Sequence, residues 1–269
     1  MGLVARNVAI LLGGAAFVLL GSVGGAFPIE NEDAGQPMAV PPVDAASVTV
    51  LDRITVGSRT GDSAIEQLAS VSTVSGEAIE RRQATTPGDL LFGVPGVAVQ
   101  TDSKRVASSI NIRGLQDFGR VAVIVDGARQ DFHRSDHGPQ NFFFLDPDLV
   151  QQVEVIRGPV ANTYGSGAIG GVVVFETKDA DDFLKPDENW AISSTARFES
   201  NGPGWTTSTT GAFRFNEAFD VIGNFVYRDY DDYDDGGGDT VPGTAFDVLS
   251  GMVKTTIRPT DNSELKLGW

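Results

Sequence analysis

The feature that most constrains the fold is a two-residue alternation of side chains in the C-terminal third of the chain. In the first run one face carries Trp205, Phe213 and Phe215, and the opposite face carries Thr206, Ser208, Thr210, Arg214 and Asn216. Similar alternation returns around residues 219–228 and 249–258. Successive side chains of a β-strand point to opposite faces. Runs of about 10 residues with one apolar and one polar face are typical of a transmembrane β-barrel wall.

The connections between these runs alternate in length. Residues 201–204, 216–218 and 259–262 form short turns, whereas residues 229–244 form a long acidic connection. Outer-membrane barrels have short periplasmic turns and longer external loops, so we expect the long connection to lie outside. The alternative is a soluble secreted β-rich binding protein with a sandwich fold. Its solvent face should carry more charge, and its apolar faces fewer aromatic residues.

Composition argues against several classes of function. The chain has 20 basic and 36 acidic residues, which argues against nucleic-acid binding because phosphate recognition relies on clustered Lys and Arg. It has no cysteine, so disulfides, thiolate metal sites and thiol nucleophiles are excluded. We find no base and nucleophile pair with supporting spacing. The sequence therefore predicts neither an enzyme nor a catalytic cofactor, and no metal site.

Residues 1–26 have the layout of a secretory signal peptide. Arg6 supplies a positive charge, an apolar stretch runs from Val8 to Leu20, and small residues lead to Ala26. The alternative is a membrane anchor, but the apolar stretch is too short to span a bilayer comfortably. Elsewhere, no apolar run approaches the roughly 18 residues that a membrane helix needs.

A tether and an extended segment follow. Residues 27–46 contain Pro37, Pro41 and Pro42 among acidic and small residues, which predicts a flexible tether. Next, Ile54 and Val56 alternate with polar residues, as in a β-strand. This segment is either the first strand of the folded domain or an unpaired strand that a partner can add to its own sheet.

The middle of the chain predicts a compact α+β unit. Short Val-rich and Ile-rich runs alternate with glycine turns between Asn111 and Phe175, which indicates a small sheet with tight connections. One helix is expected to open at Ser75-Gly76-Glu77 and to run through Arg82, and another is expected from Pro87 onward, behind a Thr86 cap. A further helical turn is expected within residues 148–154, capped by Asp146 or Asp148 and leading into a strand at 153–157.

This middle region resembles the plug domain of TonB-dependent outer-membrane receptors. The motifs in register are Ile112-Arg113-Gly114, Val125-Asp126-Gly127, residues 153–159 (VEVIRGP) and residues 164–171 (YGSGAIGG). The expected organisation is a signal peptide at 1–26, a flexible linker with a TonB box at 27–60, a plug domain at 61–180 and the first five barrel strands at 181–269. Such barrels close with about 22 strands, so we expect an N-terminal fragment with an incomplete barrel.

The resemblance implies roles for two groups of residues. The TonB box would offer its backbone to a TonB-type periplasmic energy-coupling protein, and it comprises Asp52, Arg53, Ile54, Thr55 and Val56. A polar seal between plug and barrel would use Arg113, Glu154, Arg157 and Glu176. Charges enclosed in a pore need partners, so these four either satisfy one another facing the wall or form a seal that force can open.

A cargo is also implied. Three features of the sequence are similar to those of haem receptors of the haemoglobin/transferrin/lactoferrin group. They are the segment Asp126 to Gln130, a histidine before a glycine in the loop that follows, and Leu145-Asp146-Pro147. His137, or alternatively His133, would ligate haem iron, and a second ligand would come from a barrel segment beyond residue 269. Phe142, Phe143 and Phe144 would either pack towards the barrel or form a shelf for the macrocycle.

These implications describe a monomeric receptor in the outer membrane of a Gram-negative bacterium, in contact with lipid, importing haem or haem from haem proteins. A ferric siderophore is the alternative cargo. The acidic residues between Asp229 and Asp239 could bind calcium, but their spacing departs from the EF-hand register and favours a solvated loop.

Overall fold

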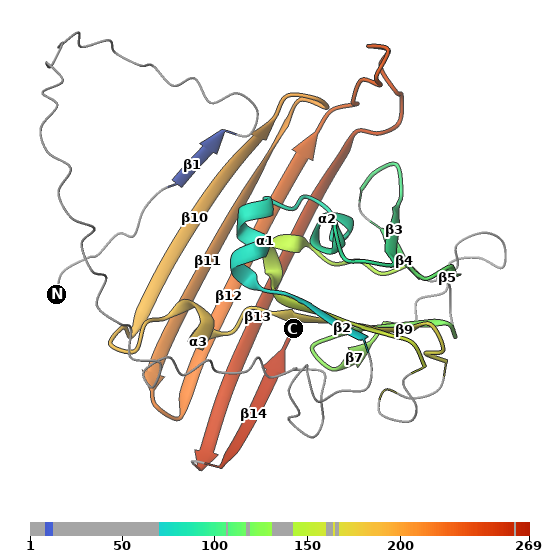
Figure 1. The fold of residues 1–269 in the computed structure, drawn as a ribbon. Helices are drawn as coiled ribbons and strands as arrows, with labels where there is room; N and C mark the ends of the chain where they lie inside the picture. Colours follow the sequence, from blue (N-terminus) through green and yellow to red (C-terminus); the bar gives the residue numbers. More distant parts are fainter. Residues whose placement is uncertain are drawn as a thin grey trace, which may run out of the picture.

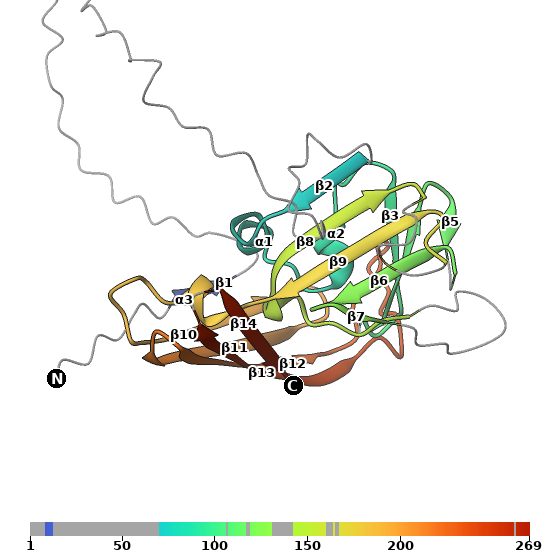
Figure 2. The same cartoon turned by 90° about the horizontal axis from the view of Figure 1, so that it is seen from below.

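The computed structural model describes residues 9–12, 70–105, 107–116, 119–130, 142–159, 164, 167–260 and 262–269. Two parts are visible in Figure 1: an N-terminal body, residues 70–177, and a wall of long strands, β10 to β14. Figure 2 shows the body lying over one face of the curved wall. A short connection, residues 178–189, joins them and contains helix α3 (Ala180–Phe183). Within the described ranges, no helix has the length and apolarity that a membrane span requires.

The two helices of the body form where the sequence predicts them. Helix α1 spans Gly76–Arg82, and helix α2 spans Pro87–Leu91. A capping box starts α2: the backbone N–H of Asp89 donates to the Thr86 hydroxyl at 3.3 Å, and the Thr86 N–H donates to the Asp89 carboxylate at 2.8 Å. The box satisfies two N–H groups that a helix start leaves unpaired, and Pro87 occupies a position that needs no N–H.

Two sheets complete the body. The five-stranded sheet has the order β2-β8-β9-β6-β7, and its strands are Ser70–Val74, Val150–Arg157, Gly171–Thr177, Val121–Val125 and Ala128–Arg129. Strands β6 and β9 run parallel, and the other pairs are antiparallel. The three-stranded sheet contains β3 (Val97–Thr101), β4 (Ser108–Ile112) and β5 (Leu115–Gln116). Their shared core includes Leu90, Ile112, Val153 and Phe175, all without solvent exposure.

One predicted element is shorter than expected. The turn before β8 is a 3-10 helix at Pro147–Leu149, capped by Asp146, and it does not continue to residue 154. Strand β8 already begins at Val150, which pairs with Thr177 of β9. Pairing with the neighbouring strand therefore replaces the rest of the predicted helical turn.

The wall is an antiparallel sheet whose strands follow one another in sequence. Its strands are β10 (Trp190–Glu199), β11 (Gly204–Asn216), β12 (Phe219–Tyr230), β13 (Phe246–Thr260) and β14 (Ser263–Gly268). On the edge of β10, strand β1 (Ala9–Leu12), inside the predicted signal peptide, pairs in parallel. Strands β10 to β14 and the short and long connections between them agree with the expected pattern, whereas β1 lies where the sequence predicts a signal peptide and no strand. The fold is thus an α+β body followed by antiparallel strands.

The two faces of the wall differ as the alternation predicts. The face away from the body exposes aromatic and aliphatic side chains, among them Trp205, Phe213, Phe215, Phe225 and Leu249. The face towards the body buries polar side chains, among them Thr206, Ser208, Thr210, Asn224, Arg228 and Lys254. Apolar contact between wall and body is limited to small clusters, one of which joins Leu149 to Val226 and Met252.

Candidate functional site

Among the described residues, the most buried ion pair between the body and the wall joins Arg228 of β12 to Asp146. The Nε and Nη2 atoms of Arg228 each donate to an Asp146 oxygen at 2.8 Å, and each side chain is only 4% exposed. Nη2 also donates to Asp148 at 3.0 Å. The same Asp146 carboxylate accepts a hydrogen bond from the Asp148 backbone N–H at 2.9 Å. The capping of the 3-10 helix therefore holds this carboxylate in position to pair with Arg228. A bidentate, charge-assisted pair is geometrically specific.

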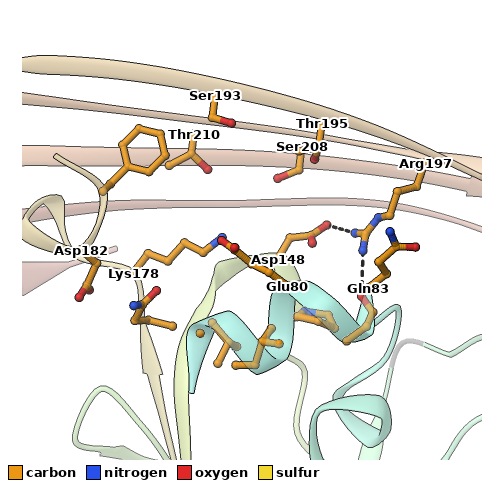
Figure 3. A pocket seen from close by; sticks show the side chains of 17 residues that line it. Glu80, Gln83, Asp148, Lys178, Asp182, Ser193, Thr195, Arg197, Ser208 and Thr210 are labelled. Atoms are coloured by element: carbon orange, nitrogen blue, oxygen red, sulfur yellow. Dashed lines mark hydrogen bonds and ion pairs between the residues drawn. The ribbon is translucent and has the colours of Figure 1, made fainter. Parts of the chain in front are cut away.

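A second contact links β10 to the same turn. Arg197 donates to the Asp148 carboxylate and, at 3.3 Å, to the carbonyl oxygen of Ala84. Figure 3 shows Arg197 reaching from the wall towards α1. The cavity beside Arg197 has a volume of about 330 Å³. The wall side of this cavity is lined by the hydroxyl side chains of Ser193, Thr195, Ser208 and Thr210. The interface is therefore polar around Arg197 as well.

Further ion pairs join the wall to β9 and the connection. Lys254 of β13 donates to the Thr177 carbonyl at 3.0 Å and lies 3.3 Å from Asp126 and 3.1 Å from Asp179. Lys266 of β14 lies 2.6 Å from Asp179. Arg214 and Arg258 both pair with Asp181.

In these contacts the wall supplies the bases, and the body and connection supply the acids; the pair between Arg105 of the body and Glu199 of β10 has the opposite arrangement. The bases are Arg197, Arg214, Arg228, Arg258, Lys254 and Lys266. We call this set of contacts the interface ion pairs. Separating the two parts exposes both partners to water, which can solvate each charge.

The predicted seal residue Arg157 donates hydrogen bonds to a neighbouring strand of the body. It donates to the Ser72 hydroxyl at 2.8 Å and to the Ser70 hydroxyl at 2.7 Å, which ties edge strand β2 to β8. Burial lowers the pKa of Arg157, and the nearby positive charge of Arg113 lowers it further. Arg113 itself has a left-handed backbone, φ 51°, and donates its N–H to the Gly96 carbonyl at 2.9 Å.

The predicted acids of the seal form a second like-charge pair. Glu154 is buried in β8, and Glu176 lies on neighbouring β9. Burial, followed by the negative charges of Glu154 and Asp126, raises the pKa of Glu176 to about 7, although Lys266 and Lys254 of the wall act in the opposite direction. The structure thus brings the four residues together as Arg113 with Arg157 and Glu154 with Glu176. Their role as a seal stays a prediction.

Sequence reasoning missed the acidic half of the interface ion pairs. The sequence identifies Asp146 only as a helix cap and as part of a cargo motif, and Asp148 only as a cap. A signal was present on the wall, because Arg214, Arg228 and Lys254 fall on its polar face by alternation. Bases on a face that becomes buried need acidic partners nearby.

The predicted TonB box, Asp52 to Val56, and both histidines, His133 and His137, lie outside the described residues. The backbone on both sides of the histidine segment lies within the described residues and is held by hydrogen bonds. On one side the Gln130 N–H donates to the Val123 carbonyl at 2.8 Å. On the other side Phe143 exchanges two backbone hydrogen bonds with Ser108, at 2.9 and 3.1 Å.

The three phenylalanines after this segment have different environments. Phe142 and Phe143 are buried, and the Phe143 ring centroid lies 5.3 Å from that of Phe175 in the core of the body. Phe143 therefore packs inside the body and forms no shelf for a macrocycle. Phe144 is 54% exposed and is the one member of the three whose side chain faces solvent.

The acidic connection between β12 and β13 uses its carboxylates to hold the loop together. Asp232 accepts the N–H groups of Thr244 and Ala245, both at 2.7 Å, and these bonds hold its pKa below the usual value. Asp235 accepts the N–H of Asp239 at 3.1 Å and that of Gly237 at 2.8 Å, and these bonds lower its pKa in the same way. In the part of the chain that the structure describes, no cluster of three or more His, Cys, Asp or Glu residues could hold a metal ion.

Comparison with known proteins gives a family for the N-terminal body. Residues 63–172 match the model of the TonB-dependent Receptor Plug Domain. The chain is 37% identical over 169 residues to a hemin receptor of Yersinia pestis, which covers 62% of this chain and 24% of that protein. It is 40% identical over 118 residues to the heme/hemopexin utilization protein C of Haemophilus influenzae, covering 44% of this chain and 16% of the relative.

A solved structure extends the likeness into the wall. The hemophore receptor HasR of Serratia marcescens, solved in complex with its hemophore HasA and heme, superposes with a TM-score of 0.67 at 30% identity. The match covers 76% of this chain and 31% of that chain. The chain thus spans well under half the length of the relatives it matches. Residues 63–172 belong to the plug domain family of TonB-dependent receptors, and the strands that follow match part of the barrel in receptors of that family.

Proposed function

We propose that the complete protein is a TonB-dependent receptor that imports haem, or haem taken from haem proteins, across the outer membrane of a Gram-negative bacterium. The observation that supports a role in transport is that the interface ion pairs hold the plug against the wall. Arg228 and Asp146 form the most buried of these pairs. The names and identities of the two curated relatives support haem as the cargo. Residues 1–26 would direct export, and the finished receptor would be a monomer in contact with lipid.

The interface can open without unfolding the plug. The plug core is an apolar cluster within the body, centred on residues such as Leu90, Val153 and Phe175, and it does not depend on the wall. Across the interface, apolar contact is restricted to small clusters, whereas charged contacts recur from β10 to β14. Water solvates charges once they are separated, which lowers the free-energy cost of opening the interface. Exposing an apolar core to water has no such compensation. Force should therefore separate the charged surfaces first.

Energy would enter through the N-terminal segment. Asp52 to Val56 would add as a strand to a TonB-type protein, and pulling would act on the chain before β2. Strand β2 is an edge strand whose serines are held by Arg157. In this proposal the Arg157 contacts are the first in the described part of the body to bear the load, and the charges of Arg113, Glu154 and Glu176 respond as β2 and β8 move.

Cargo would bind on the side where the histidine segment leaves the plug. His137, with His133 as the alternative, is the proposed axial ligand for haem iron, since neutral imidazole is a common haem ligand. Both lie between the anchored positions Gln130 and Phe143. Haem is here the cargo and takes no part in catalysis by the protein.

Growth of a receptor-deficient Gram-negative host tests the proposed function. The complete gene should restore growth when haem is the sole iron source, and should not do so when a ferric siderophore is the sole source. A host that also lacks the TonB-type protein serves as the control and should not grow on haem. Growth on the siderophore alone would assign the receptor to the alternative cargo.

A further inference from the structure

Helix α3 packs on the wall and not in the core of the body. Figure 2 shows this helix lying on the wall, to one side of the sheets of the body. Ala180, at its start, and Leu184, directly after its end, are buried in a cluster that is separate from the core of the body. The other buried members of this cluster belong to the wall, and they are Ala191 of β10, Ala212 of β11 and Ile222 of β12. The short connection therefore has its own apolar contact with the wall.

Charged contacts hold the same helix from two strands. The Asp181 carboxylate pairs with Arg214 of β11 and with Arg258 of β13. Arg258 is itself held at 2.7 Å by Asp220 of β12, whose side chain is only 1% exposed. Because Asp181 is 55% exposed, water screens its ion pairs, and these alone would hold the helix weakly. The apolar cluster and the ion pairs thus act together on one short helix.

Lys254 of β13 marks the boundary between this helix and the body. Its side chain is 6% exposed, and its Nζ lies 3.1 Å from the carboxylate of Asp179, the N-cap of α3. The same Nζ donates to the carbonyl oxygen of Thr177, the last residue of β9, at 3.0 Å. On the side of the body it lies 3.3 Å from Asp126. Residues 177–179 are therefore the place where the chain passes from the body to the wall.

A force on the N-terminal segment would reach the body before it reaches α3. The segment leads into β2, which is joined through β8 to β9, and α3 follows β9 in the chain. The body meets the wall through ion pairs and through a smaller apolar cluster, Leu149 with Val226 and Met252. Exposing apolar surface to water costs free energy, whereas separated charges are solvated. The contacts of the body should therefore separate while those of α3 persist.

We propose that residues 179–184 form an anchor that stays on the wall during transport, so that the plug body turns about residues 177–179. The inference rests on the proposed function, because it assumes that force moves the plug. It divides the interface ion pairs into two sets. The pairs made by Arg197 and Arg228 open, whereas the pairs made by Asp181 stay closed. The anchor then brings the body back to its contacts after each cycle.

Thiol labelling during haem uptake tests the anchor, because residues 1–269 contain no cysteine. Ala212→Cys places a thiol on the wall beneath α3, and Val226→Cys places one on the wall beneath the body. Both positions are buried, with 6% and 0% of their surface exposed. In cells with the complete receptor, the coupling protein and haem, a small maleimide should label the thiol of Val226→Cys and not that of Ala212→Cys. Neither thiol should be labelled when the coupling protein is absent.

A weakened anchor should expose the thiol of Ala212→Cys as well. Leu184→Ala removes buried apolar atoms from the cluster, and in this background the thiol should become labelled during uptake. The labelling should again require the coupling protein, which separates release under force from misfolding. Lys185→Ala is the matched control, because Lys185 is the next residue and its side chain is 61% exposed. This control should keep the thiol of Ala212→Cys protected.

Three outcomes would count against these statements. Equal labelling of Ala212→Cys and Val226→Cys in the otherwise unchanged receptor would overturn the anchor and leave haem uptake standing, because α3 would then leave the wall together with the body. Continued protection of Ala212→Cys in the Leu184→Ala background would overturn it too, because the cluster would not be what holds α3. No labelling of Val226→Cys during uptake would instead contradict displacement of the plug, and with it the proposed function.

Discussion

Arg228 on the wall and Asp146 on the plug form a bidentate ion pair in which both side chains are 96% buried. Asp146 is fixed at the start of a 3-10 helix by the turn that it caps, and Arg228 is fixed by its place on β12. Each member therefore comes from a rigid element of a different part of the molecule. The pair holds the plug to the wall at one defined place, and moving the plug breaks it.

Replacing one member should loosen the plug. Arg228→Ala leaves Asp146 buried without its charged partner, and loss of one partner of a buried pair costs about 3–5 kcal/mol. We expect protease to reach the plug of the complete receptor at a lower urea concentration. The double variant Arg228→Ala with Asp146→Ala should be less destabilised than the sum of the single variants. Strict additivity would show that the two residues do not act as a pair.

The acid pair in the plug predicts a dependence on pH. The pKa of Glu176 is raised from 4.5 to about 7 in the folded protein, so the folded state binds more protons than the unfolded state between these values. Stability should fall as pH rises through this window. Glu176→Gln should remove this fall in stability with rising pH. Above pH 7 the variant should be more stable than the wild type by about 1 kcal/mol, a value that is reduced because Glu176 is partly exposed to solvent. Unfolding midpoints measured at several pH values check this, and parallel curves for both proteins would contradict it.

Gly171 at the start of β9 cannot carry a side chain. Its φ is +144°, and a Cβ there would lie 2.3 Å from the carbonyl oxygen of Ile156. Gly171→Ala should destabilise the receptor by about 2 kcal/mol or more, seen as a lower unfolding midpoint. Gly211→Ala on β11 is the matched control, because its Cβ would meet only the Ala191 carbonyl at 4.0 Å. Equal effects of the two substitutions would argue against the steric explanation.

The predicted TonB box gives a test that separates binding from transport. Ile54→Pro removes a backbone N–H from the segment, and strand addition requires such donors. We expect haem binding to be unchanged and haem uptake to be lost. Ile54→Val, which keeps the donor and a β-branched side chain, should transport normally. Normal uptake by the proline variant would refute the assignment of residues 52–56.

The proposed iron ligand can be followed by spectroscopy. His137→Ala in the complete receptor should shift the Soret band of bound haem and weaken haem affinity, because imidazole coordination changes the ligand field of the iron. His133→Ala is the comparison and should leave both unchanged. The opposite result would move the ligand to His133, and no change in either variant would remove both histidines from the iron.

The fold was predictable wherever a local pattern determines it. Phe213 and Phe215 alternate with Arg214 because one face of β11 is apolar and the other meets the plug, and the structure has that arrangement. Thr86 and Pro87 start α2 because capping depends on neighbours in sequence. The local sequence predicts too long a helical turn after Asp146, because the strand that starts at Val150 depends on pairing with Thr177 of a distant strand.

The interface was only half predictable for the same reason. Alternation placed Arg228 and Lys254 on the polar face of the wall, and a resemblance pointed to charges in the plug. Which acids meet these bases depends on how the plug docks, and docking joins residues that are far apart in sequence, such as Asp146 and Arg228. No local pattern distinguishes Asp146 from any other helix cap. Arg157 was singled out by its motif, yet its partners, Ser70 and Ser72, become neighbours only through pairing of β2 with β8.

Uptake of iron-labelled haem by a receptor-deficient host tests the central claim most directly. Cells carrying the complete receptor should accumulate labelled iron when the TonB-type protein is present, and should only bind haem at the surface when it is deleted. Equal accumulation with and without the coupling protein, or no binding of haem in either strain, would contradict energy-driven displacement of the plug by a receptor for haem.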